Sequence, residues 1–199
     1  MAFTPWRDML REGLRPVQDA LRPAHEEVSH CRAYSSWLIP GMLQTRGYIE
    51  TIFAAIQDER GLSDDDVQAA IESRLGRQPL MHASERRYDF LIEESVLRCG
   101  IGGATVMREQ TEHLSDAMSS TGVTIGLVPM GPCRRRWPDE SFWMFDSSRV
   151  TIELVSGELE LTDAQDVTEY ARRFDQFSEQ ALFHDDARRL IDQVLAALA

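Results

Sequence analysis

Two adjacent glutamates, Glu93 and Glu94, are the residues whose type and position most directly suggest acid–base chemistry. They follow segment 88–92, where large apolar residues alternate with others and predict a strand. Neighbouring side chains of a strand point to opposite faces of the sheet. The two carboxylates therefore cannot act as a facing acid–base pair on one substrate.

Glu94 shares a face of this predicted strand with the apolar residues of segment 88–92. If that face belongs to the core, the carboxylate needs a cationic partner, and Arg74, Arg77 and Arg98 are the candidates. A carboxylate that faces a ligand is the other interpretation, and it makes Glu94 the candidate catalytic acid or base. Both interpretations stay open at the level of sequence.

The histidines do not have the spacing of metal ligands. His25 and His30 are five residues apart, whereas ligands on one helical face are three or four apart, and the chain has no His-Glu-x-x-His motif. We therefore expect no metal site.

The three cysteines, Cys31, Cys99 and Cys133, are widely spaced and odd in number, which predicts reduced thiols rather than disulfides. A reactive Cys133 is the alternative, because the adjacent arginines 134–136 would lower its pKa.

A glycine cluster, Gly100–Gly103, follows the predicted strand and precedes a predicted helix, as a phosphate-binding loop would. The chain has neither G-x-G-x-x-G nor G-K-[ST], so a tight turn is the preferred interpretation. There is also no G-x-S-x-G nucleophile motif. We therefore expect no cofactor.

Trp143 stands in an aromatic segment, residues 142–145, that is apolar on both faces of a predicted strand. One face is expected to meet the core, and the other a helix, a partner or an apolar ligand. Core packing is the commoner role for any one such residue, but Trp143 is retained as a candidate ligand contact.

Composition narrows the class of protein. The chain has 199 residues, 21 basic side chains (all arginine) against 33 acidic ones, and a net charge of -12. Such a charge predicts repulsion from nucleic acid and from anionic lipid. No apolar run is long enough for a transmembrane helix, and the N-terminus lacks a signal-peptide core, so we expect a cytoplasmic protein.

The elements that must position these residues indicate an α+β fold. Helical patterns at both ends flank a strand-rich middle, which predicts one antiparallel or mixed sheet of about four to five strands with N- and C-terminal helices. Residues 1–30 are expected to form a helical lead-in or connector, and 31–199 a single domain. Expected helices are 45–61, 63–78 and 103–118; expected strands are 88–94, 123–128, 141–145, 149–155 and, as the end of a hairpin, 158–161.

Several motifs in order resemble the C-terminal domain of unknown function that follows an Xre-type helix-turn-helix in actinobacterial transcriptional regulators. The matching segments are Pro40-Gly41-Met42-Leu43-Gln44-Thr45 with Tyr48, Arg74-x-x-Arg77-Gln78, Glu94-x-x-Leu97-Arg98, Gly102-Gly103-x-x-Val106-Met107-x-x-Gln110, 123–129, Phe142 and Glu153. Thr111, where the family usually has leucine, and the arginines 134–136 depart from the pattern. The helix-turn-helix itself is absent.

The resemblance implies a regulatory domain that senses a small-molecule ligand or a small partner protein and does not itself bind DNA. Buried polar side chains from separate elements must converge on one another or on a ligand. The candidate ligand-binding residues are Gln44, Arg77, Gln78, Glu94 and Trp143.

Two other functions stay open. One is a stand-alone enzyme or accessory protein of a biosynthetic pathway, with Glu94 as acid or base. The other is a dimerisation module, which would make the chain a homodimer.

Overall fold

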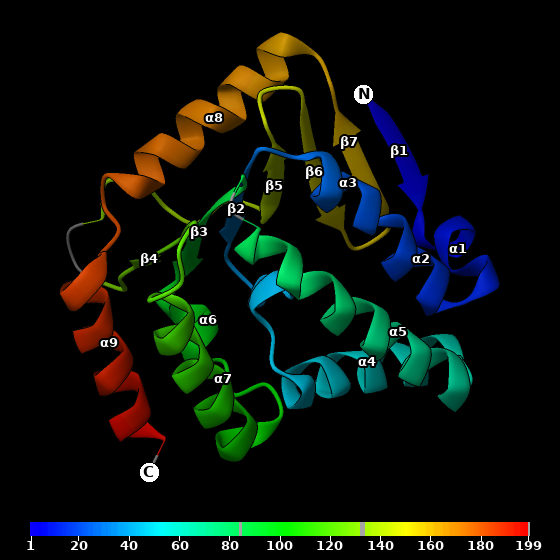
Figure 1. Cartoon of the computed structure of the whole chain (residues 1–199), viewed down its shortest axis with the longest axis horizontal. Helices are drawn as coiled ribbons and strands as arrows, with labels where there is room; N and C mark the ends of the chain where they lie inside the picture. The colour runs from blue at the N-terminus through cyan, green and yellow to red at the C-terminus, as the bar shows by residue number, and fades with distance from the viewer. Residues whose placement is uncertain (84, 132–133, 199) are drawn as a thin grey trace.

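A computed structural model describes residues 1–83, 85–131 and 134–198. One seven-stranded mixed sheet runs through the molecule in the order β1-β7-β6-β5-β2-β3-β4 (Figure 1). The strands are β1 (Ala2–Pro5), β2 (His30–Ser35), β3 (Arg87–Glu93), β4 (Val123–Val128), β5 (Phe142–Phe145), β6 (Arg149–Leu154) and β7 (Gly157–Leu161).

Helices precede, interrupt and follow the strands along the described chain. The α-helices are α1 (Trp6–Met9), α2 (Leu14–Ala20), α3 (Arg22–Glu27), α4 (Arg46–Arg60), α5 (Asp64–Arg77), α6 (Glu94–Arg98), α7 (Gly103–Ala117), α8 (Ala164–Ser178) and α9 (His184–Ala197). Three short 3-10 helices join them: η1 (Leu10–Glu12), η2 (Gly41–Leu43) and η3 (Gln78–His82).

The sheet has a parallel half and an antiparallel half. β2, β3 and β4 are parallel, and helical crossovers connect them: α4 and α5 between the first two strands, α6 and α7 between the next two. β5, β6, β7 and β1 pair antiparallel. Parallel strands require such crossovers, so the helices are placed over the sheet by its connectivity.

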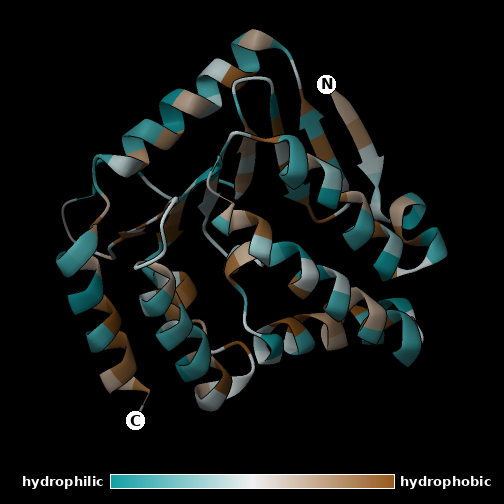
Figure 2. Cartoon of the chain, viewed as in Figure 1, coloured by the Kyte–Doolittle hydropathy of each residue, from teal (hydrophilic) through white to brown (hydrophobic). Residues whose placement is uncertain are grey.

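The two faces of the sheet have separate cores. One core joins the β2–β5 face to residues of α6, α7 and α9. The other joins the opposite face of β5, β6 and β7 to α8, through Val167, Phe174 and Phe177. Figure 1 shows α8 along one side of the sheet and most other helices on the opposite side, and α8 and α9 alternate hydrophilic and hydrophobic residues in Figure 2.

A third, smaller core joins α2, α4 and α5 through Leu14, Ile49, Phe53 and Val67. The two long helices begin where the sequence predicts: the side chain of Thr45 accepts a hydrogen bond from the N–H of Tyr48, and Ser63 caps α5 in the same way. This core positions α5, whose last residue is the candidate Arg77 and which is followed directly by the candidate Gln78.

The prediction of an α+β fold with one mixed sheet and helices at both ends is confirmed, but the sheet has seven strands rather than four to five. The strands not predicted are β1 and β2. β1 is a four-residue strand at the edge of the sheet, too short for a clear sequence pattern. β2 is central, with hydrogen-bonded neighbours on both sides, and its sequence therefore lacks the regular alternation of polar and apolar residues that predicts a strand.

The prediction that Glu94 continues the strand is wrong. β3 ends at Glu93, and Glu94 is the first residue of α6. The glycine cluster accordingly follows a short helix, not a strand, and Gly100, Gly102 and Gly103 all have positive φ angles, as a tight turn requires. Among the described residues, none of the helices combines the length and apolar character needed to cross a membrane.

Candidate functional site

Two glutamines, Gln78 and Gln110, hold the segment Pro40–Thr45, which contains η2 and leads from β2 to α4. The Gln78 amide donates to the carbonyls of Gly41 (3.1 Å) and Gln44 (2.7 Å). Gln110 accepts from the N–H of Thr45 and donates to the carbonyl of Leu43, both at 2.8 Å. The carbonyls of Gly41, Leu43 and Gln44 and the N–H of Thr45 are thus satisfied by side chains from other elements rather than by a neighbouring strand.

Gln44 belongs to the same polar network. Its amide donates to the carbonyl of Ile39 (2.7 Å), and its oxygen accepts from Nη1 of Arg74 (2.7 Å). Nε of Arg74 also donates to Oε1 of Gln18 (3.0 Å), and the guanidinium lies 4.4 Å from the ring centre of Phe53. Both the nitrogen and the oxygen of the Gln44 side-chain amide therefore have hydrogen-bond partners within the protein.

Arg77 lies deeper, with 3% of its surface exposed. Its Nη1 donates to the backbone carbonyl of Gln18 (2.8 Å), whereas its buried Nε has no hydrogen-bond partner. Burial, and then the charge of Arg22, lower the pKa of Arg77 to about 10, and Tyr88 opposes this. Arg77 and Gln44 are thus connected through Gln18 and Arg74, and Gln78 joins them through the carbonyl of Gln44.

Glu94 does not join this group. Its carboxylate accepts from Nε of Arg98 (2.7 Å) and from the N–H of Met130 (2.7 Å). Arg98 is one of the partners predicted from the sequence. The ion pair ties α6 to the segment after β4, which is the role of an organising carboxylate, although Glu94 also lines a cavity of about 350 Å³ with Asp186 and Arg189.

Trp143 is half-buried on the face of β5 that also carries Phe145. It packs edge-to-face against His25 and Phe90, with ring centres 5.6 and 6.0 Å apart. The expectation that segment 142–145 is apolar on both faces is confirmed, because Phe142 belongs to the core under α8. Most of the Trp143 surface is taken up by core contacts.

A buried ion pair that the sequence does not reveal lies at the end of β3. Glu93 is 1% exposed and accepts hydrogen bonds from the hydroxyl of Tyr34 (2.6 Å) and from Nη2 of Arg134 (2.7 Å), while Nη1 of Arg134 contacts its second oxygen. Burial, and then the hydrogen bond to Glu93, raise the pKa of Tyr34. The sequence indicates only that Arg134 is unusual, because it is one of the arginines 134–136 that depart from the family pattern. It does not indicate that Glu93 is the partner of Arg134.

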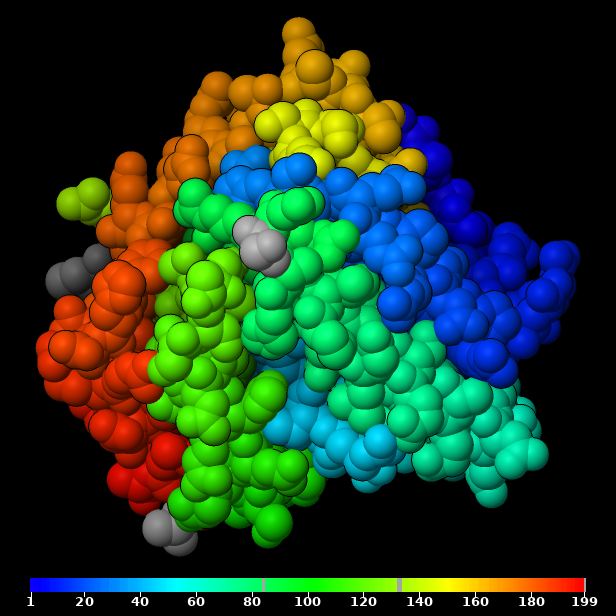
Figure 3. Space-filling view, viewed as in Figure 1, coloured from blue at the N-terminus to red at the C-terminus, as the bar shows by residue number. Residues whose placement is uncertain are grey.

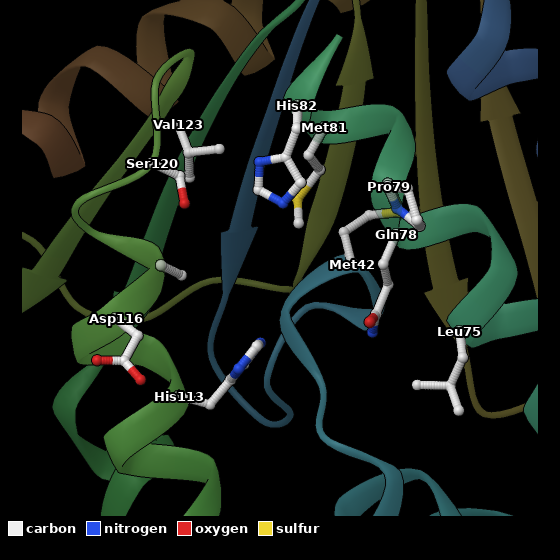
Figure 4. A pocket seen from close by; sticks show the side chains of 11 residues that line it. Met42, Leu75, Gln78, Pro79, Met81, His82, His113, Asp116, Ser120 and Val123 are labelled. Carbon is white, nitrogen blue, oxygen red and sulfur yellow. The ribbon is translucent and has the colours of Figure 1, made fainter.

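A cavity of about 330 Å³ lies between η3 and α7, and we call it the η3–α7 cavity. Apolar side chains of Met42, Met81 and Ala117 line its interior, and the polar residues are Gln78, His82, His113, Asp116 and Ser120. Figure 4 shows the His82 ring hanging from η3 and the His113 ring pointing from α7 into the same space.

Burial lowers the pKa of His113 below its ordinary value, and nearby His82 acts in the same direction, while Asp116 and Glu109 oppose it. His113 is therefore neutral near pH 7 and offers one donor and one acceptor nitrogen to the cavity. The histidine spacing in the sequence excludes common metal motifs but does not indicate that His82 and His113 face one cavity. The sequence analysis therefore did not predict this pair.

Across the described parts of the chain, no group of three His, Cys, Asp or Glu side chains is arranged to hold a metal ion. Cys31 is buried and Cys99 is exposed, and burial raises the pKa of the Cys31 thiol. The proposed reactive Cys133 lies outside the described residues.

Comparisons with solved structures give distant likenesses. The chain is similar to NucT from Helicobacter pylori (8% identity, TM-score 0.47, 92% of this chain and 96% of the other) and to TrmBL2, an archaeal chromatin protein with a novel mode of DNA binding (12%, 0.43, 86% and 51%). No curated protein matches the chain. One family model, described as domain of unknown function DUF5753, matches residues 19–193. The chain therefore belongs to this family.

Proposed function

We propose that the chain is a regulatory domain that senses a small molecule in the η3–α7 cavity. The observation that carries the proposal is the cavity itself, about 330 Å³ with an apolar interior and a few polar groups. Ligand sites in proteins have this composition and volumes of roughly 300–1,000 Å³. The site accepts a small molecule with an apolar body and one hydrogen-bonding end.

The position of the cavity suggests how binding is signalled. One wall, with Gln78 and His82, belongs to the α5–η3 segment, and the other, with His113 and Asp116, belongs to α7. A ligand that prefers one packing of these walls shifts the population toward that packing. Gln78 also bonds the carbonyls of Gly41 and Gln44, so the shift reaches the segment before α4.

In this proposal the chain is the sensory part of an Xre-type transcriptional regulator in the cytoplasm, and another part makes the contact with DNA. The net charge of -12 supports this division, because phosphate backbones attract basic surfaces. The partner that receives the signal is a small protein or a second copy of the chain.

An enzyme that uses Glu94 is the second candidate, supported by the cavity of about 350 Å³ on which Glu94 lies. Arg98 and the Met130 N–H donate to its two oxygens at 2.7 Å. Both oxygens of this carboxylate therefore already accept hydrogen bonds from the protein, which is the arrangement of a structural ion pair. We therefore favour the sensory function.

Thermal unfolding in the presence of a panel of small carboxylic acids, alcohols and amides tests the proposal. Ala117→Leu fills the cavity, and Ala104→Leu on the exposed side of α7 is the matched control. We expect a panel member that raises the Tm of the wild type and of Ala104→Leu but not of Ala117→Leu. Equal shifts in all three proteins, or none in the wild type, contradict a sensory cavity.

A further inference from the structure

The η3–α7 cavity has an apolar interior and a polar mouth. Met42 and Met81 are almost completely buried, and Ala117 is buried with them. His82 and Asp116 are exposed residues, so they lie where the cavity meets solvent. In Figure 3, α7 and the chain after α5 lie next to each other on one face of the molecule. A ligand therefore places its apolar body against the methionines and its polar head near the mouth.

Gln78 gives the cavity a hydrogen-bond acceptor. Its amide nitrogen donates to the carbonyls of Gly41 (3.1 Å) and Gln44 (2.7 Å), and these two contacts fix which way the amide is turned. Its oxygen, Oε1, has no hydrogen-bond partner among the described residues. An acceptor that loses its water when a ligand binds needs a new donor, and the ligand must supply it.

The lining of the cavity carries a carboxylate and no cationic arginine. Asp116 is the acidic residue of the lining, and none of the 21 basic residues of the chain, all arginine, lies among the described residues that line it. His113, which points into the same space in Figure 4, is neutral near pH 7 because burial lowers its pKa. An anion that leaves water for this cavity finds no arginine to pair with, so its transfer is costly.

Two further lining residues supply donors. A neutral imidazole has one N–H to donate, which gives His113 this role, and the hydroxyl of Ser120 can also donate. The acceptors are Oε1 of Gln78 and the carboxylate of Asp116. A head group with two donor hydrogens and one acceptor oxygen satisfies both kinds of group.

We propose that the η3–α7 cavity selects an uncharged primary amide with a small apolar body, and that it discriminates against the carboxylate of the same shape. The inference rests on the sensory function proposed above and names the class of ligand for that site. The amide nitrogen of the ligand donates to Gln78 and to Asp116, and its oxygen accepts from His113 or Ser120. A carboxylate head has no hydrogen to donate, so it leaves Oε1 of Gln78 unpaired.

NMR titration of the whole chain with three heads on one apolar body tests the inference. Hexanamide, methyl pentyl ketone and hexanoate have nearly the same shape and end in an amino group, a methyl group and a charged oxygen. Hydrocinnamamide, benzylacetone and hydrocinnamate repeat the series on an aromatic body. We expect at least one amide to bind, about tenfold or more tightly than the ketone and the carboxylate of its series, because both leave lining acceptors without a donor.

Asp116→Asn removes the negative charge at the mouth and keeps the size of the side chain. The Asp116 carboxylate has no hydrogen bond among the described residues, so folding does not depend on it. We expect the preference for the amide over the carboxylate to narrow by about threefold or more. Asp192→Asn, at an exposed position of α9, is the matched control and keeps the wild-type preference.

Ala117→Leu fills the cavity and is expected to abolish binding of the amide, whereas Ala104→Leu retains it. Equal affinities for the amide and the carboxylate, or for the amide and the ketone, overturn the inference. If Ala117→Leu then abolishes binding of all of them, the sensory function stands and only the class of ligand is wrong.

Three further outcomes also overturn the inference. They are an unchanged preference in Asp116→Asn, binding of the amide that survives in Ala117→Leu, and failure of both amides to bind. In the last case the wider thermal panel still decides on the sensory function.

Discussion

The guanidinium of Arg134 lies against the buried carboxylate of Glu93, although the two residues are 41 positions apart in the chain. Both terminal nitrogens of the arginine take part, and the hydroxyl of Tyr34 donates to the same carboxylate. The Tyr34 ring in turn stacks on Phe177 of α8, with ring centres 3.9 Å apart. One ion pair thus connects β3, β2, α8 and the segment before β5.

We expect Arg134→Ala to lower the free energy of unfolding by about 3–5 kcal/mol, because it leaves a buried carboxylate without its counter-ion. The neighbouring exposed Arg135→Ala is expected to change it by less than about 0.5 kcal/mol. Urea unfolding followed by circular dichroism measures both. Similar small losses in the two variants would mean that the pair contributes nothing.

Glu94→Gln is expected to cost about 1–3 kcal/mol of stability, because an amide cannot replace both acceptor oxygens and loses the charge that faces Arg98. The exposed Glu112→Gln on α7 is the matched control and should be near neutral. Chemical denaturation of both variants checks this. A fully stable Glu94→Gln would remove the organising role and favour the catalytic interpretation.

Gln110→Ala leaves the N–H of Thr45 and the carbonyl of Leu43 buried without partners. Each orphaned group costs about 1–3 kcal/mol, so a loss of several kcal/mol is expected. Gln68→Ala, at an exposed position of α5, should cost little. Hydrogen exchange should show faster exchange of the Thr45 amide in the first variant. Unchanged exchange there would contradict the assigned contacts.

The pH dependence of stability should report on His25. Burial, and then the charges of Arg77 and Arg149, lower its pKa from 6.5 to about 3 in the folded chain. Between these values the unfolded chain binds more protons, so stability is complete above pH 6.5 and falls as the pH decreases toward 3. The full loss is about 5 kcal/mol, an order of magnitude derived from 1.36 kcal/mol per pKa unit.

Urea midpoints measured between pH 7 and pH 4 check this dependence. We expect His25→Gln, which has no titrating group at this position, to lose less stability than the wild type over that range. The wild-type hydrogen bond to Tyr88, at 3.3 Å, is the contact that the variant must replace. Parallel pH profiles of the two proteins would show that His25 is not the group responsible.

The fold class could be predicted from the sequence because the helices carry local signals. Thr45 and Ser63 cap helices that the apolar spacing also predicts, and Gly61 ends the first of them. β2 has no such signal. Its neighbours β3 and β5 come from distant parts of the chain, and their pairing determines that it is a strand.

The candidate site was predictable only in part, because contacts between residues that are distant in the sequence determine most of it. Gln78 lies beside Gln44 because the segment that contains Gln44 needs polar partners, and this need is visible in the Pro-Gly sequence of the segment. Arg77 is connected to them only through Gln18 and Arg74. Glu94 and Trp143 lie elsewhere, because the strand ends at Glu93 and because Trp143 packs against His25. Arg134 could not be assigned to Glu93, since an irregular segment carries no period that fixes its position.

The pairing of Ala2 in β1 with Glu160 in β7 has a consequence for biosynthesis. Ribosomes add about 5–20 residues per second, so roughly eight to thirty seconds separate the synthesis of the two strands. During this interval β1 has no partner strand, and the exposed side chain of Phe3 is available to other nascent chains. The outer edge of the sheet is therefore completed only after β7 has left the exit tunnel.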